Sequence, residues 1–156
     1  MKLCLCFHCL CESYEGLTGT AQDLFVSLED MRNLIDKLLE RGYRFSTIDD
    51  PTDNTVSITF DDGYHNNLLF SDLAQQYDIP YVMFVSAYYN QSGDGFPWLK
   101  PECPSYDQMY QFDYYAHHQR ANISGIIAKD SSPQRPLTFD ELNNLASTGL
   151  VEIGCH

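Results

Sequence analysis

Two adjacent carboxylates and a distant histidine are the residues of this chain best suited to chemistry. Asp61 and Asp62 follow the apolar run "VSITF" and precede Gly63, and His156 follows "VEIGC". A carboxylate together with imidazole suits a divalent metal such as zinc, and a second carboxylate can take a proton from water. The pattern indicates one aspartate that binds a metal and one that acts as a base. The alternative is that both merely cap the next helix, whose N-terminus favours anions.

Buried parallel strands are needed to position these side chains. Residues 56–60 and 79–86 are rich in β-branched and apolar side chains, and 65–77 has helical spacing between them. Strand, helix and strand in about thirty residues predict a βαβ unit, whose strands are parallel. Since parallel strands end at one rim, we expect both aspartates to lie near His156, which follows a predicted strand at 150–155. We expect Gly63 to turn the chain so that both carboxylates face the cavity.

Two further strands and two further helices complete the predicted elements. The strands lie at 2–8 and 43–48, and the helices lie at 27–42 and 138–149, each ending at a glycine. Ser27 and Thr138 are suited to N-cap these helices. Glu141 completes a capping box with Thr138, whereas Asp30 stands where Glu or Gln is usual in the first helix.

Residues 87–136 interrupt this regular pattern within what we predict to be a single domain over 1–156. The segment carries Pro, Gly and many aromatic side chains, with a helical tendency only at 105–119. We interpret it as an insertion over the edge of the sheet, where loops often form substrate walls. Its aromatic rings could stack on sugars, but packing of the loop onto its domain is the favoured interpretation. His117 and His118 are expected in solvent, and His65 on a helix surface.

The composition is that of a packed acidic protein. Of the 156 residues 44% are hydrophobic, and the formal net charge is −13. Such an acidic chain has no electrostatic footprint for nucleic acid or anionic lipid. It has no run of about 18 apolar residues, so no transmembrane segment is predicted. The start "MKLCLCFHCLC" lacks a clear signal peptide, which favours the cytoplasm and leaves the location open.

Four of the six cysteines crowd the start of the chain. Cys4, Cys6, Cys9 and Cys11 could form a structural zinc module, but alternate residues of a strand face opposite sides, so four thiolates do not easily converge. Cysteine also behaves as a small buried hydrophobe. The favoured interpretation is a first strand in which the cysteines are packing residues.

Several segments resemble one enzyme family. "ITFDDGYHNN" with "LAQQYDIPYVMFVS", and then "LTFDELNNLASTGLVEIGCH", resemble the polysaccharide deacetylases, the NodB-homology domain of carbohydrate esterase family 4. Upstream, "FVSLEDMRNLIDKLLERGYRF" and "CFHCL" resemble the helix before the first motif and the opening strand. The resemblance covers nearly the whole chain except 87–136.

The resemblance implies an α/β fold, a distorted parallel β/α barrel, and a hydrolase that removes acetyl groups from carbohydrate, with N-acetyl favoured over O-acetyl. By position, Asp61 resembles the catalytic base, and Asp62 and His156 resemble ligands of a divalent metal. The metal that the resemblance leads us to expect is zinc. The substrate would be an acetylated polysaccharide. His8 resembles an early histidine of the family and is a candidate for the substrate groove.

The chain also departs from the family pattern. The second histidine of the second motif and all later motifs are absent, so the metal site lacks its third protein ligand. A whole barrel needs on the order of 250 residues. We therefore expect an N-terminal portion of a deacetylase with an incomplete barrel, and marginal stability because strand edges are exposed. The alternative is an inactive fragment that at most binds carbohydrate or a partner.

Overall fold

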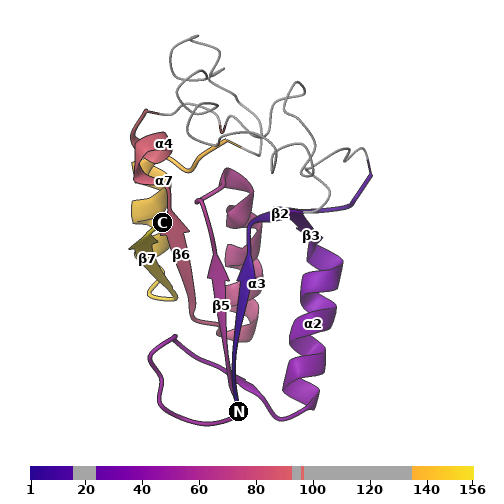
Figure 1. Ribbon diagram of the computed structural model, residues 1–156. Coiled ribbons are helices and arrows are strands. Elements are labelled where there is room, and N and C mark those ends of the chain that lie inside the picture. The colour runs from indigo at the N-terminus through magenta and orange to yellow at the C-terminus, as the bar shows by residue number, and fades with distance from the viewer. Residues whose placement is uncertain (16–23, 93–95, 97–134) are drawn as a thin grey trace, which may run out of the picture.

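Parallel strands form the centre of the described fold. The computed structural model describes residues 1–15, 24–92, 96 and 135–156. Its main sheet has five strands in the order β1-β5-β6-β7, with β4 beside β5. These are β1 (Lys2–Phe7), β4 (Arg44–Phe45), β5 (Thr55–Phe60), β6 (Tyr81–Val85) and β7 (Val151–Cys155). All pairings between them are parallel, so their carboxyl ends point to the same rim (Figure 1).

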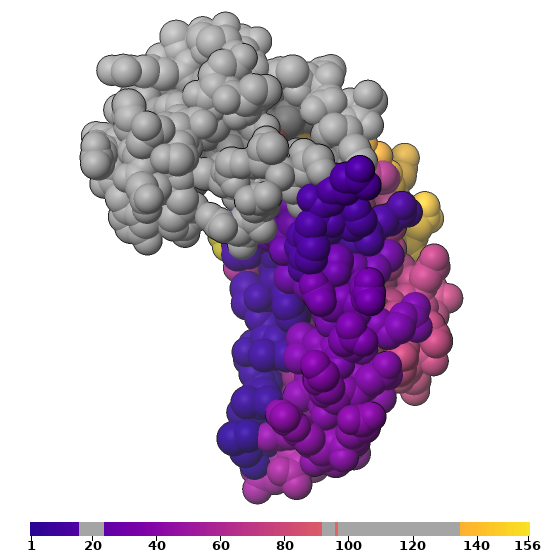
Figure 2. Space-filling view, turned by 90° about the vertical axis from the view of Figure 1, so that its right-hand side faces the viewer, coloured from indigo at the N-terminus to yellow at the C-terminus, as the bar shows by residue number. Residues whose placement is uncertain are grey.

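The sheet is open within the described part of the chain. β1 and β7 are its two edges, and neither pairs with a further described strand on its outer side. Figure 2 shows β1, in indigo, at the molecular surface beside the purple helix α2 (Leu28–Glu40). An open, mainly parallel sheet with helices packed against it is the fold class that the sequence predicted, an α/β barrel that is incomplete.

β5 is the buried axis of this sheet. All six of its residues are buried, including the polar Thr55, Ser57 and Thr59. β1 lies on one side of β5, with Cys6 opposite Thr59 and Phe7 opposite Phe60. On the core side the Phe60 ring packs 5.0 Å from the ring of Phe70. A strand that is buried along its whole length has an almost continuous apolar sequence. For this reason the sequence predicted the position of β5 well.

Helices cover the sheet and supply the rest of the core. Besides α2 they are α3 (Leu68–Tyr77), α4 (Ala87–Ser92), α7 (Phe139–Ala146) and the one-turn 3₁₀ helix η1 (His65–Asn67). In Figure 1, α3 lies behind the strands, α2 lies on the β1 side and α7 on the β7 side. Met31 of α2 is a fully buried core residue, whereas Leu39 of the same helix is 43% exposed.

Local hydrogen bonds fix the starts of the two capped helices. Thr138 and Glu141 make the complete capping box that the sequence predicted for α7. Ser27 caps α2 by accepting a hydrogen bond from the Asp30 amide at 3.1 Å. The Asp30 carboxylate accepts from the Ser27 hydroxyl instead of the Ser27 amide, because aspartate is one methylene shorter than the usual glutamate. The Ser27 amide donates to the Tyr14 hydroxyl at 3.1 Å.

A second short strand follows the predicted strand at 2–8, which the sequence did not show. β1 ends at Phe7, and β2 (Cys9–Cys11) pairs with β3 (Phe25–Ser27) in a separate two-stranded parallel sheet. Strands of three residues are too short to show an alternating pattern, so β3 was missed. The packing interpretation of the cysteines is correct for the buried Cys9 and wrong for the exposed Cys4 and Cys6.

Other boundaries also differ from the sequence prediction. β4 has only two residues, and α7 ends at Ala146, before Gly149. The predicted insertion begins with α4. The helical tendency at 105–119, most of the insertion's aromatic residues, and His117 and His118 lie outside the described residues. None of the described helices is long and apolar enough to cross a membrane.

Replacement of Gly63 by alanine is expected to destabilise the fold. Gly63 has φ +77°, and a Cβ atom there would lie 2.9 Å from Cγ1 of Val85. The left-handed conformation costs alanine about 1–2 kcal/mol, and the steric overlap adds about 1–3 kcal/mol. Gly149→Ala is the matched control, since Gly149 has φ +75° with nothing within 4 Å of the added Cβ. Urea unfolding should show a clearly larger loss for Gly63→Ala, and equal losses would contradict the packing argument.

Candidate active site

The turn after β5 carries the two aspartates. Asp62 and Gly63 are consecutive residues with positive φ, +69° and +77°. The Asp61 amide donates to the Phe7 carbonyl at 2.9 Å, and the Asp62 carbonyl accepts from the Ser86 amide at 3.1 Å. The main chain on both sides of β5 therefore fixes this turn. The sequence predicted the special conformation of Gly63 and missed that of Asp62, which aspartate tolerates better than most residues.

The helix-capping alternative for the aspartates is wrong. The N-cap residue of η1 is Tyr64, and that of α3 is Asn67. Neither aspartate occupies a cap position, so their carboxylates are not explained by helix termination.

The structure brings the three predicted side chains together. The His156 amide donates to the Val85 carbonyl at 2.9 Å, which continues the β6–β7 ladder and places the imidazole at the rim. Nε2 of His156 lies 3.5 Å from Oδ2 of Asp61, and Nδ1 lies 3.6 Å from Oδ1 of Asp62. The Asp62 side chain is 11% exposed, against 20% for Asp61 and 47% for His156. The imidazole thus bridges a buried carboxylate and a more open one.

The two carboxylates differ in their electrostatic surroundings. Burial raises the pKa of Asp62, and the positive charges of His156 and His8 act in the opposite direction. The hydroxyl of Ser86 lies 3.5 Å from Oδ1 of Asp62. Burial penalises the anionic form of the carboxylate, and a cation bound beside it would relieve that penalty.

His8 lies at the break between β1 and β2 and is held there by two buried asparagines. Nδ2 of Asn67 donates to the His8 carbonyl at 2.7 Å, and the Leu10 amide donates to Oδ1 of Asn66 at 3.2 Å. His8 is close enough to Asp62 for its charge to affect the pKa of that carboxyl. Asn66 and Asn67 were not predicted as positioning residues. Their only signal in the sequence is a pair of amides just after the acidic motif.

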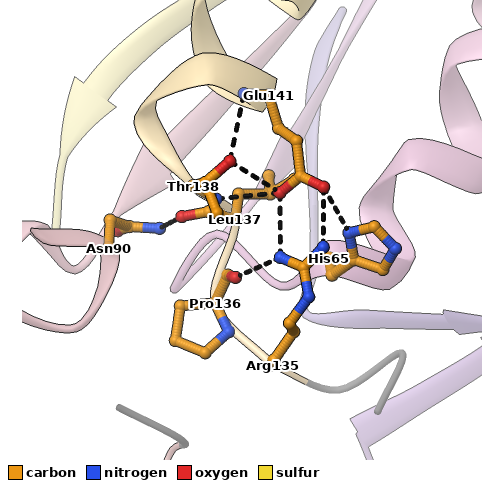
Figure 3. Close-up of polar contacts among 7 residues, drawn as sticks. All are labelled: His65, Asn90, Arg135, Pro136, Leu137, Thr138 and Glu141. Carbon is orange, nitrogen blue, oxygen red and sulfur yellow. Dashed lines mark hydrogen bonds and ion pairs between the residues drawn. The ribbon is translucent and has the colours of Figure 1, made fainter. Parts of the chain in front are cut away.

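Figure 3 shows a second polar cluster, formed around the segment that leads into α7. Arg135 donates two hydrogen bonds to the Glu141 carboxylate, at 2.9 and 2.7 Å. His65 contacts the same carboxylate, with Nδ1 3.1 Å from Oε1. The Leu137 amide donates to the Gly63 carbonyl at 2.9 Å. His65 therefore belongs to this cluster. Through its contacts with His65 and Arg135, Glu141 connects the start of α7 to the chain around the site.

Asp62 and His156 are a pair of side chains whose donor types and spacing are compatible with a divalent metal. Two ligands of a tetrahedral metal with bonds of roughly 2.1 Å lie about 3.4 Å apart. The separation of 3.6 Å between Asp62 Oδ1 and His156 Nδ1 is close to that value. Within the described residues, no group of three or more His, Cys, Asp or Glu side chains is arranged to hold a metal ion. The described chain thus offers two donors where a catalytic zinc site usually has three.

Comparison with known proteins places this fold among deacetylases. No family model matches the sequence, and no curated protein matches it. Among solved structures, the chain is similar to a de-N-acetylase from Aggregatibacter actinomycetemcomitans, with a TM-score of 0.67, 16% identity, and coverage of 99% of this chain and 54% of that one. It is also similar to a polysaccharide deacetylase from Bacillus cereus, with a TM-score of 0.58 and 14% identity. That match covers 99% of this chain and 38% of the other. A third similar structure is the deacetylase domain of BpsB from Bordetella bronchiseptica, with a TM-score of 0.58 and 16% identity. That match covers 99% of this chain and 53% of the other.

These similarities confirm the fold that the sequence resemblance implied. At 14–16% identity they show the fold alone. The chain spans about half the length of two of these structures and 38% of the third.

Replacement of Glu141 by glutamine should weaken the fold in a pH-dependent manner. The hydrogen bond from Arg135 holds the pKa of Glu141 at about 2, below its ordinary value of 4.5. A lowered pKa stabilises the folded state above pH 4.5, and this contribution is lost as the pH falls towards 2. Glu141→Gln is therefore expected to cost on the order of 2 kcal/mol at pH 7, where the ion pair with Arg135 is lost.

Urea unfolding of both proteins between pH 7 and pH 3 measures this effect. The difference between wild type and Glu141→Gln should shrink as the pH falls through this range. Asp140→Asn, at the neighbouring exposed position of α7, is the control and should show little effect. A wild-type advantage that stays constant with pH would contradict the role of the Glu141 charge.

Proposed function

We propose that this chain belongs to a metal-dependent hydrolase that removes acetyl groups, N-acetyl in preference to O-acetyl, from a polysaccharide. The observation that carries the proposal is the meeting of Asp61, Asp62 and His156 at the rim of the sheet. The fold, shared with solved deacetylases, supports the choice of reaction.

Asp62 and His156 are the proposed metal-holding residues. The buried Asp62 carboxylate and the imidazole of His156 face each other across 3.6 Å, and a mixed oxygen and nitrogen donor set suits zinc. Bound there, the cation would supply a Lewis acid for the acetyl carbonyl. The left-handed turn holds Asp62 in place without a helix cap, and its Oδ1 faces the imidazole of His156 with the Ser86 hydroxyl 3.5 Å away.

Asp61 is the proposed general base. It is more exposed than Asp62, and its Oδ2 lies 3.5 Å from Nε2 of His156. Asp61 accepts a proton from the attacking water as the oxygen adds to the acetyl carbon. Asp61 then returns this proton to the nitrogen as the carbon–nitrogen bond breaks, which gives acetate and a free amine on the sugar. The two carboxylates therefore have separate tasks because their surroundings differ.

The charge of the chain and the position of His8 bear on the substrate. A net charge of −13 favours neutral or cationic sugars over anionic ones. His8, held at the β1–β2 break beside Asp62, is proposed to line the substrate groove. A de-N-acetylase among the similar structures supports an N-acetylated substrate.

A binding role without catalysis is the second candidate. It is favoured by one observation: the described residues supply two metal donors and no third. In that case the chain would bind carbohydrate or a partner protein and would not hydrolyse acetamide. The two candidates differ in whether acetate is released when zinc is present.

Removal of Asp62 or His156 is expected to weaken zinc binding. Calorimetry on the full chain should show a loss of at least roughly tenfold in affinity for Asp62→Ala and for His156→Ala, because each removes a direct donor. Asp72→Ala removes an exposed carboxylate of α3 and is the matched control, with affinity unchanged. Equal zinc binding by all four proteins would place the metal elsewhere.

Removal of the base should abolish turnover and spare the metal. With an N-acetylglucosamine oligomer and zinc, Asp61→Asn is expected to release acetate about 10²–10⁴-fold more slowly than wild type. Its zinc affinity should be close to that of wild type, and a chelator should stop the wild-type reaction. An O-acetylated oligomer tests the preference for N-acetyl groups. Zinc binding through Asp62 without any acetate release would support the binding role instead.

A further inference from the structure

A thiol contacts the carboxylate that we assign as the base. Sγ of Cys6 donates a hydrogen bond to Oδ2 of Asp61 at 3.3 Å. The same oxygen atom lies 3.5 Å from Nε2 of His156. The thiol also lies 4.0 Å from the carbonyl of Phe7, which is a weaker contact. Oδ2 of Asp61 is thus contacted by a thiol of β1 and lies near the imidazole of the residue that follows β7.

The strand register explains why this thiol reaches the site. Cys6 lies opposite Thr59 in the β1–β5 ladder, and Asp61 follows Thr59 by two residues. Residues two apart in a strand face the same side. Thr59 is buried and hydrogen-bonds the Cys6 thiol, lowering the pKa that burial of the thiol raises. A chain of contacts therefore runs from Thr59 through Cys6 to Asp61 and ends at His156.

The chemistry of a thiol suits the orientation of a base. A lysine or arginine at this position would bring a positive charge and make the carboxylate a poorer proton acceptor. A thiol is a weak, neutral donor that restrains the carboxylate without adding charge. Partial desolvation of the thiol, although the Cys6 residue is largely exposed, raises its pKa above the ordinary value, and Asp61 adds to this rise, so the thiol stays protonated and able to donate.

We propose that Cys6 is a positioning residue for Asp61, whose thiol holds the carboxylate in the orientation that faces His156. The effect on catalysis rests on the proposed function. The contact itself does not, so it can be tested without any enzymatic activity. Cys4, two residues earlier on the same side of β1 and also exposed, is the matched control.

Infrared spectroscopy of the S–H stretch tests the contact in the full chain. The difference spectrum between wild type and Cys6→Ala isolates the Cys6 band, and that between wild type and Cys4→Ala isolates the Cys4 band. The Cys6 band is expected at lower frequency than the Cys4 band, and it should move towards that position in Asp61→Ala. Asp61→Asn, which keeps an acceptor oxygen, gives a second variant if Asp61→Ala does not fold. Coincident Cys6 and Cys4 bands in the wild type would overturn the proposal.

The imidazole signals of His156 test the orientation of Asp61. The NMR resonances of this ring, assigned by their loss in His156→Gln, should shift in Cys6→Ala. They should return towards the wild-type position in Cys6→Ser, which restores a hydroxyl donor, and stay unchanged in Cys4→Ala. Resonances that are the same in Cys6→Ala and wild type would overturn the positioning role.

Kinetics then separates this proposal from the proposed function. In an active protein, Cys6→Ala should lower kcat about three- to tenfold with KM and zinc affinity unchanged, and Cys6→Ser should recover most of the loss. If the wild type releases no acetate while the infrared and NMR results hold, the proposed function fails and the thiol–carboxylate contact stands. An active wild type with an equally active Cys6→Ala would overturn the positioning role.

Discussion

The left-handed turn at Asp62 and Gly63 is the constraint on which the site depends. Its main chain is hydrogen-bonded by the Ser86 amide after β6 and the Leu137 amide before α7, while the preceding Asp61 amide bonds to Phe7 of β1. The side chain of Val85 leaves room at Gly63 for a hydrogen atom only. Three segments far apart in the sequence thus determine one turn. An ordinary right-handed turn would direct the two carboxylates differently and break these hydrogen bonds.

Parallel pairing turns that local constraint into a site. Because β5, β6 and β7 run in the same direction, the residue after β7 arrives at the rim where the residues after β5 already lie. The His156 amide bonds to Val85, the residue whose side chain packs against Gly63. Val85 therefore restricts the residue at Gly63 and also fixes the position of His156. The Arg135–Glu141–His65 cluster holds the other side of the turn through the chain that leads into α7.

The adjacent aspartates differ in burial and in electrostatic surroundings. Asp62 is the more buried of the two, and burial raises its pKa, which makes it the carboxylate that gains more from a bound cation. Asp61 is more open and is contacted by the Cys6 thiol, a neutral donor that leaves its charge in place. Repulsion between two neighbouring anions is moderated by the imidazole of His156 between them.

The sequence alone determined the features that depend on contacts between residues close in the chain and on the direction of the strands. The caps at Ser27 and Thr138 are contacts between residues three apart, so their residue types predicted them. The buried runs at β5 and β6 predicted parallel strands, and parallel direction alone predicted that the aspartates and His156 would share a rim. The tertiary structure decided the second short strand that follows His8, the left-handed conformation of Asp62 and the contact of Cys6 with Asp61. That last pair is 55 positions apart and meets only through the β1–β5 register. A register is set by the packing of whole strands, and no short stretch of residues encodes it.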